Sequence, residues 1–230
     1  MTLSAFLIQL VNGLAGASSL FLVAAGLTLI FGVTRIVNFA HGSLYMLGAY
    51  VAYSAIGRFG ATIPGYWLAV LGAALLVGAI AALIEMLLLR RIYAAPELLQ
   101  LIATFGVVLI VKDVTLALWG PEDLLGPRAA GLKGAIPIGS GLLPQYDALL
   151  IATGPAILAL LWWLTRRTRW GVLVRAATEN RTMVQALGVD QAWLFTSVFF
   201  LGASLAGLAG ALQLPRESAN LGMDLSVIAE

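Results

Sequence analysis

The chain has 230 residues, of which 61% are hydrophobic and only 10% are charged, and its formal net charge is +2. Soluble domains usually carry about 25% charged residues, and a soluble fold of this length could not bury so much apolar surface. The composition therefore indicates an integral membrane protein, and residues 1–230 are expected to form a single membrane domain. The small net charge argues against nucleic acid as a partner.

Several kinds of chemistry are missing from the residue inventory. The absence of cysteine excludes disulfides and thiolate sites, and a single histidine, His41, argues against a histidine-based metal site. A phosphate-binding loop ends in Lys-Ser or Lys-Thr, whereas Lys112 precedes Asp and Lys133 precedes Gly. His41 also has no catalytic partner beyond nearby Ser43. We therefore expect no enzyme activity, cofactor or metal, and any ATP hydrolysis that drives the protein must occur in another chain.

Apolar runs of membrane-spanning length recur along the chain. A helix needs about 20 apolar residues to cross about 30 Å of hydrocarbon. The first run has no lysine or arginine before it and continues to Phe31, so it is a retained span and not a cleaved signal. The sequence predicts an all-α, polytopic bundle of about six transmembrane helices, at residues 5–30, 42–57, 64–89, 98–119, 148–165 and 192–214.

The arginines and lysines between these segments predict the orientation. If loop 166–191 faces the cytosol, connections 31–41 and 90–97 do too, because the spans alternate. The connections assigned to the inside then hold eight basic residues, and those assigned to the outside hold four. This asymmetry places Met1 and the Pro- and Gly-rich loop 120–147 outside. The inside set is Arg35, Arg90, Arg91, Arg166, Arg167, Arg169, Arg175 and Arg181, and the outside set is Arg58, Arg128, Lys133 and Arg216.

Small residues recur at four-residue spacing in two of the predicted helices. This spacing lets helix backbones approach closely in lipid. Generic packing within the bundle is the favoured interpretation, and close packing against another subunit is the alternative. The lines are Ala74-Gly78-Ala82 in the third helix, and Gly202-Ala206-Gly210 and Ala203-Gly207-Ala211 in the sixth.

Polar residues inside the predicted spans have a structural and a functional interpretation. Glu85 lies one turn before Arg90, which predicts an ion pair at the membrane interface. Lys112 is expected to extend its ammonium group toward the outer interface, because a charge at mid-membrane costs about 2.5–3.5 kcal/mol. Gln100 and Thr104 either face a solute path or hydrogen-bond to neighbouring helices.

The connection between the first two spans carries an unusual polar trio. Arg35, Asn38 and His41 fall at i, i+3 and i+6, so a helix would place them along one side. One interpretation is a polar turn whose side chains satisfy free backbone groups. The other is a broken or re-entrant element that lines a solute path, since the neighbouring residues are apolar.

The segment after Thr165 is too polar to cross a membrane and has an amphipathic pattern. It predicts a short helix from Glu179 to Leu187, ended by a left-handed Gly188, with Asp190 capping the next span. Such a helix either lies on the lipid surface, held by arginines, or docks in a groove of a cytosolic partner.

The residues 26–50, GLTLIFGVTRIVNFAHGSLYMLGAY, closely resemble the N-terminal signature of the branched-chain amino acid ABC-transporter permeases of the LivH type. Residues 182–188 are similar to the cytoplasmic Glu-Ala-Ala-x-x-x-Gly motif of ABC importer permeases, although Thr182, Met183 and Val184 replace its first three residues. Segment 175–180 also resembles the branched-chain permeases. The candidates for a translocation path remain the polar residues Arg35, Asn38, His41, Gln100 and Thr104. The resemblance of segment 175–188 supports ATPase coupling, for which the candidates are Arg175, Glu179, Thr182, Met183, Ala186, Leu187 and Gly188.

The same resemblance implies the architecture and partners of an ABC importer permease. The chain would translocate branched-chain amino acids or a related small solute across a bacterial-type plasma (inner) membrane. Its partners would be the lipid bilayer, a second homologous permease, two cytosolic ATPase subunits and an extracytoplasmic solute-binding protein. Since members of the family continue past the sixth span, a C-terminal part of the family fold is expected to be missing. The alternative function is an ATP-independent secondary carrier or channel.

Overall fold

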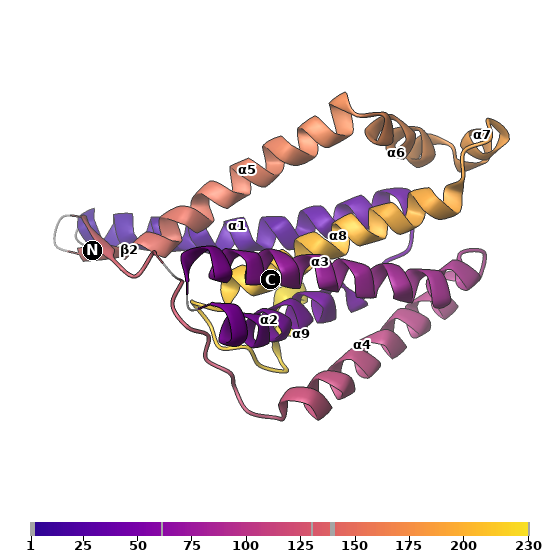
Figure 1. Ribbon diagram of the computed structural model, residues 1–230. Coiled ribbons are helices and arrows are strands. Elements are labelled where there is room, and N and C mark those ends of the chain that lie inside the picture. The colour runs from indigo at the N-terminus through magenta and orange to yellow at the C-terminus, as the bar shows by residue number, and fades with distance from the viewer. Residues whose placement is uncertain (1–2, 61, 130, 139–140, 230) are drawn as a thin grey trace.

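The computed structural model describes residues 3–60, 62–129, 131–138 and 141–229 (Figure 1). Its long helices run roughly alongside one another, and α4 and α5 diverge from the others on opposite sides. The elements are α1 (Leu3–Thr34), α2 (Ala40–Phe59), α3 (Ile63–Leu87), the 3-10 helix η1 (Leu89–Ile92), α4 (Glu97–Trp119), β1 (Ala135–Ile138), β2 (Gly141–Pro144), α5 (Gln145–Arg167), α6 (Arg169–Glu179), α7 (Arg181–Ala186), α8 (Gln191–Gln213) and α9 (Met223–Ala229).

Within the described residues, five helices are long and apolar enough to cross a membrane: α1, α3, α4, α5 and α8. They correspond to five of the six predicted spans. The remaining predicted span forms α2, a 20-residue helix that is less apolar than the others. Its length of about 30 Å would still suffice to cross the hydrocarbon. Because α2 packs between α3, α8 and α9 and is mostly buried, its surroundings are protein and it does not need a lipid-compatible surface.

Helix α8 is the centre of the bundle, and the lines of small residues explain how its neighbours reach it. A Cβ atom added to Gly202 would lie 2.7 Å from the carbonyl oxygen of Gly26 in α1. A Cβ atom on Gly48 in α2 would lie 2.6 Å from the Cα atom of Gly207. Gly78 in α3 leaves the same kind of space for Ser204. The small residues therefore serve close packing inside the bundle, which is the interpretation that the sequence favoured.

The two ends of the bundle differ in their connections. At one end, here called the hairpin end, β1 and β2 form an antiparallel hairpin with Ala135 opposite Pro144 (Figure 1). An isolated bridge between Leu124 and Ala219 ties the start of the loop after α4 to the stretch after α8. At the opposite end, here called the α6–α7 end, η1 and the break between α1 and α2 lie beside α6 and α7.

This arrangement gathers the connections of the predicted inside set at the α6–α7 end. Successive connections between the long helices therefore lie at alternate ends of the bundle, as the prediction of orientation assumed. That the α6–α7 end faces the cytosol stays a prediction, and Met1 lies outside the described residues.

Candidate functional site

The polar trio does not lie on one helix, because the chain breaks between α1 and α2. Helix α1 ends at Thr34, Arg35 adopts a left-handed φ of 56°, and α2 begins at Ala40. The break is stabilised locally: the Thr34 hydroxyl accepts a hydrogen bond from Ile36 N at 3.3 Å, and Asn38 Oδ1 accepts one from Ala40 N at 3.2 Å. Both interpretations of the sequence, a polar turn and a broken element, require such a break, and these side chains offer the backbone hydrogen bonds that compete with helix.

The members of the trio have different surroundings. Arg35 is exposed and donates from its guanidinium to the carbonyl oxygen of Thr178 in α6 at 3.0 Å. Asn38 and His41 are buried, and His41 Nε2 lies 3.0 Å from the carbonyl oxygen of Val23 in α1. Both line a cavity of about 280 Å³ between α1, α2 and α9, whose wall includes Leu20, Leu27 and Val227. A polar turn thus accounts for Arg35, whereas Asn38 and His41 also border the groove between α1, α2 and α9.

The two candidates on α4 have their polar atoms bonded to nearby backbone. The Gln100 amide donates to the carbonyl oxygens of Ile92 and Ala95, at 3.2 and 2.9 Å, and so closes the turn between η1 and α4. The Thr104 hydroxyl donates to Leu101 O at 3.0 Å. For both residues, these contacts favour hydrogen bonding within the protein over a position facing a solute path.

The predicted helix from Glu179 to Leu187 is present as α7, which spans Arg181 to Ala186, and the separate helix α6 precedes it. Asn180 adopts an extended conformation with φ −151°, ends α6 and caps α7 by accepting a hydrogen bond from Met183 N at 2.9 Å. The helix begins two residues later than predicted, because Asn180 caps it and so cannot lie inside it. The two predicted caps are confirmed: Gly188 has a φ of +82°, and Asp190 accepts hydrogen bonds from the first backbone amides of α8.

The coupling candidates form an exposed tip on an anchored base. Met183 is 58% exposed and Leu187 is 75% exposed, while Val184 between them is buried. The other coupling candidates are exposed as well: Arg175, Glu179, Thr182, Ala186 and Gly188. Two neighbouring exposed apolar side chains are a feature of a protein-binding surface.

The base of this tip is attached to the start of α8. Trp170 donates from its indole nitrogen to Ser197 Oγ at 2.8 Å, and the Gln191 amide donates to Arg181 O at 2.6 Å. The Arg181 guanidinium lies 5.4 Å from the centre of the Phe195 ring. Burial, and secondarily the charge of a neighbouring arginine, lowers the pKa of Arg181. These contacts attach α6 and α7 to the first turns of the central helix.

Sequence reasoning missed a buried polar cluster at the same end. Glu85 has no exposed surface, and its carboxylate accepts hydrogen bonds from Arg90 at 3.2 Å, Tyr93 at 2.8 Å and Thr196 at 2.6 Å. The hydrogen bond to Glu85 raises the pKa of Arg90, while burial and then the same carboxylate raise the pKa of Tyr93. The expected interfacial pair is thus an internal junction between α3, η1 and α8.

Lys112 also differs from its prediction. Instead of reaching the interface alone, its ammonium group pairs with Asp224 Oδ1 in α9 at 3.4 Å. Asp224 lies more than a hundred residues further along the chain, so the sequence offered no signal for the pair.

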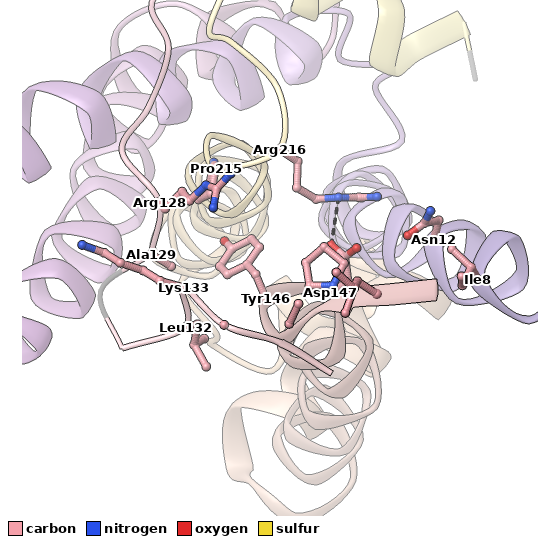
Figure 2. A pocket seen from close by; sticks show the side chains of 14 residues that line it. Ile8, Asn12, Arg128, Ala129, Leu132, Lys133, Tyr146, Asp147, Pro215 and Arg216 are labelled. Atoms are coloured by element: carbon pink, nitrogen blue, oxygen red, sulfur yellow. Dashed lines mark ion pairs between the residues drawn. The ribbon is translucent and has the colours of Figure 1, made fainter. Parts of the chain in front are cut away.

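The hairpin end has a large polar pocket, shown in Figure 2. Its volume is about 660 Å³, and its wall combines α1, the hairpin, the start of α5 and the stretch after α8. Arg216 Nε pairs with Asp147 Oδ1 at 3.2 Å, and Tyr146 donates to Leu212 O at 2.6 Å, so α5 is tied to the end of α8. Arg128 and Lys133 add two further cations to the wall, which makes the pocket cationic.

Comparison with known proteins identifies the family of the chain. Residues 9–229 match the family described as "Branched-chain amino acid transport system / permease component". No solved structure matches the chain significantly.

Three relatives illustrate the similarity. The permease protein LivH of a high-affinity branched-chain amino acid transport system from Salmonella typhimurium is 30% identical over 216 residues, 90% of this chain and 70% of the relative. The corresponding protein BraD from Pseudomonas aeruginosa is 30% identical over 234 residues, 97% and 73% of the two chains. A probable branched-chain amino acid transport permease protein LivH from Methanocaldococcus jannaschii is 33% identical over 201 residues, 84% and 61%. The chain, a multi-pass membrane protein, belongs to the family of permease components of branched-chain amino acid transport systems.

Proposed function

We propose that the chain is the membrane-spanning subunit of an ABC importer that moves branched-chain amino acids, or a related small solute, across a bacterial-type plasma (inner) membrane. The observation that carries the proposal is the exposed tip at Met183 and Leu187, with Gly188 fixed in the left-handed conformation behind it. A secondary carrier has no need of such a docking element.

The importer would contain a second homologous permease, two cytosolic ATPase subunits and an extracytoplasmic solute-binding protein. The tip of α7 would dock in a groove of an ATPase, where Met183 and Leu187 would lose their contact with water. Closure of the ATPase pair would then move α6 and α7, and the contacts of Trp170 and Arg181 would carry the motion into α8. Because α1, α2 and α3 all pack on α8, its displacement would reorganise the bundle.

The solute would be delivered at the hairpin end and released at the α6–α7 end. The cationic pocket around Arg128, Lys133 and Arg216 is the surface we assign to delivery, since it lies opposite the ATPase tip. Of the path candidates, Asn38 and His41 are favoured because they are buried and border the groove between α1, α2 and α9.

The substitution Gly188→Val tests the coupling role. The left-handed conformation of residue 188 costs about 1 kcal/mol or more for a side-chain-bearing residue, which would tilt the tip without unfolding the bundle. Gly120→Val is a stringent control at the hairpin end, where Gly120 ends α4 with open space around it. Its φ of 81° and ψ of −177° are more restrictive for a side chain, so this variant strains the backbone at least as much as Gly188→Val.

The measurements are capture of the ATPase by the purified permease and solute-stimulated ATP hydrolysis in the assembled importer. Gly188→Val should lose both, and Gly120→Val should keep both. If Gly188→Val keeps both, α6 and α7 act as a lipid-surface element. If even the unmodified chain captures no ATPase, the carrier alternative is correct.

A further inference from the structure

An open groove between α1 and α5 widens toward the α6–α7 end of the bundle. The two helices are close near Gly154, where an added Cβ atom would lie 3.0 Å from Ser18 Oγ. Helix α5 then diverges from α1 toward its junction with α6 (Figure 1). The groove has a volume of about 600 Å³, and its wall is formed by residues within 21–33 of α1, residues within 158–165 of α5 and two residues of α6. Since α1 and α5 are both long and apolar enough to span the membrane, the groove lies within the hydrocarbon.

The wall of this groove offers apolar contact. Each of its threonine hydroxyls donates to the carbonyl oxygen four residues earlier in the same helix, at 2.7–2.8 Å. These residues are Thr28, Thr165 and Thr178. Because the hydroxyls are bonded within their own helices and the rest of the wall is aliphatic or aromatic, the wall suits a hydrocarbon chain and not a polar solute.

The groove has the length of one membrane leaflet. Residues 21–33 of α1 rise by about 18 Å, at about 1.5 Å per residue. The hydrocarbon of a bilayer is about 30 Å thick, so one leaflet contributes about 15 Å. The lining residues of α1 end one turn or less before the break at Arg35, so the groove spans the leaflet on the α6–α7 side.

Two guanidinium groups lie at the α6–α7 end of the groove. Arg175 donates from Nη1 to the carbonyl oxygen of Thr165, and Arg35 donates from Nη2 to that of Thr178 at 3.0 Å. Each arginine is therefore bonded to a residue of the wall. Both are exposed, and neither forms an ion pair within the described part of the chain. A guanidinium has five N–H donors, so donors remain for an anion at this place.

The surroundings of these two arginines are cationic. Three further exposed arginines follow at the end of α5 and the start of α6: Arg166, Arg167 and Arg169. The sequence has no acidic residue between Asp147 and Glu179. Trp162, which lines the groove and is 54% exposed, adds an aromatic side chain of the kind that gathers at membrane–water interfaces. An apolar groove of leaflet length that ends in basic residues has the charge and the shape of a phospholipid.

We propose that this groove binds an anionic phospholipid, whose acyl chain lies between α1 and α5 and whose phosphate meets Arg35 and Arg175. Guanidinium groups match the geometry of phosphate oxygens, and the excess of basic residues favours an anionic over a zwitterionic headgroup. The inference goes beyond the proposed function and needs neither an ATPase nor a solute. Met183 and Leu187 are not part of the groove, so a bound lipid leaves the tip of α7 exposed.

Quenching of tryptophan fluorescence by brominated phospholipids tests the headgroup. The chain is placed in phosphatidylcholine nanodiscs, and dibrominated phosphatidylglycerol or dibrominated phosphatidylcholine is added in increasing mole fraction. Because Trp162 lines the groove, phosphatidylglycerol should quench at a severalfold lower mole fraction. Arg175→Gln should weaken this effect about fivefold, the contribution of one basic residue near a membrane surface. Arg58→Gln, at an exposed arginine near the hairpin end of α2, should leave it unchanged.

The substitution Gly32→Leu tests the groove without changing any charge. Gly32 lines the groove and has open space around it, so a leucine side chain would occupy the place of the acyl chain. Gly13→Leu is the matched control, because Gly13 lies on the same helix, also in open space, but outside the groove. Both variants replace glycine by a better helix former and should fold. Only Gly32→Leu should weaken quenching by phosphatidylglycerol, severalfold or more, and it keeps the test decisive if Arg175→Gln fails to fold.

Four outcomes would overturn the proposal. Equal quenching by the two lipids would mean unselective contact with the bilayer. Equal behaviour of Gly32→Leu and Gly13→Leu would mean that the arginines attract lipid at the surface alone. Loss of quenching on addition of inorganic phosphate at constant ionic strength would mean a site for free anions. If Gly32→Leu, but not Gly13→Leu, converts a dimer into a monomer in light scattering, the groove holds a helix of a second copy of the chain.

Discussion

The buried carboxylate of Glu85 should be the most sensitive polar position at the α6–α7 end. Glu85→Gln keeps the size of the side chain but removes its charge, and it replaces one acceptor oxygen by a donor. Arg90, Tyr93 and Thr196 all donate to this carboxylate. Hydrogen bonds to a charged group are worth about 1.5–3 kcal/mol and neutral ones about 0.5–1.5 kcal/mol, so each contact loses about 1 kcal/mol.

Over the three contacts, the expected loss of stability is about 3 kcal/mol, and exposure of Arg90 to solvent reduces it. The Arg90 side chain is 37% exposed, so water compensates part of its loss. We therefore expect a destabilisation of about 2–3 kcal/mol. For a chain of this length, 1 kcal/mol corresponds to about 2–4 °C in the unfolding midpoint, which predicts a decrease of roughly 4–12 °C.

The assay is thermal unfolding in detergent, followed by tryptophan fluorescence, with Glu122→Gln as a control in an exposed loop. Combining Glu85→Gln with Thr196→Val should give less than the sum of the two single effects, since both remove the same hydrogen bond. Equal midpoints for Glu85→Gln and Glu122→Gln would refute the reasoning. Full additivity with Thr196→Val would show that the contact across α3 and α8 contributes nothing.

Three further predictions test the packing, the break and the orientation. Gly202→Ala should destabilise the bundle by about 1–3 kcal/mol, because its Cβ would lie 2.7 Å from Gly26 O where ordinary contacts begin at 3.4 Å. Gly72→Ala, with open space around it, should be neutral or stabilising by up to about 1 kcal/mol in the same unfolding assay. His41→Leu should leave membrane levels of the protein near normal and strongly reduce uptake, and normal uptake would identify the break as structural only. Single cysteines at Glu179 and Glu122 should react with an impermeant reagent from opposite sides of sealed vesicles, and labelling from the same side would refute the topology.

Local signals in the sequence were sufficient for the helical class, for five spans and for the two caps at Gly188 and Asp190. Each depends on neighbouring residues alone: run length sets a membrane span, and a cap needs only the first or last turn of its helix. The small-residue lines of α8 were also readable, because a helix places every fourth residue on one side.

Only the tertiary structure decided which polar residues meet. Glu85 pairs with Thr196, and Lys112 with Asp224, across more than a hundred residues of sequence. A pattern of neighbouring residues cannot predict a contact between such distant positions. Nor could local sequence show that the trio would be divided by the left-handed turn at Arg35. That outcome depends on contacts of His41 with α1 and of Arg35 with α6, which form only when the helices assemble. The low dielectric of a packed bundle makes an unpaired polar group costly, so its partners are selected by the whole fold and not by the segment that carries it.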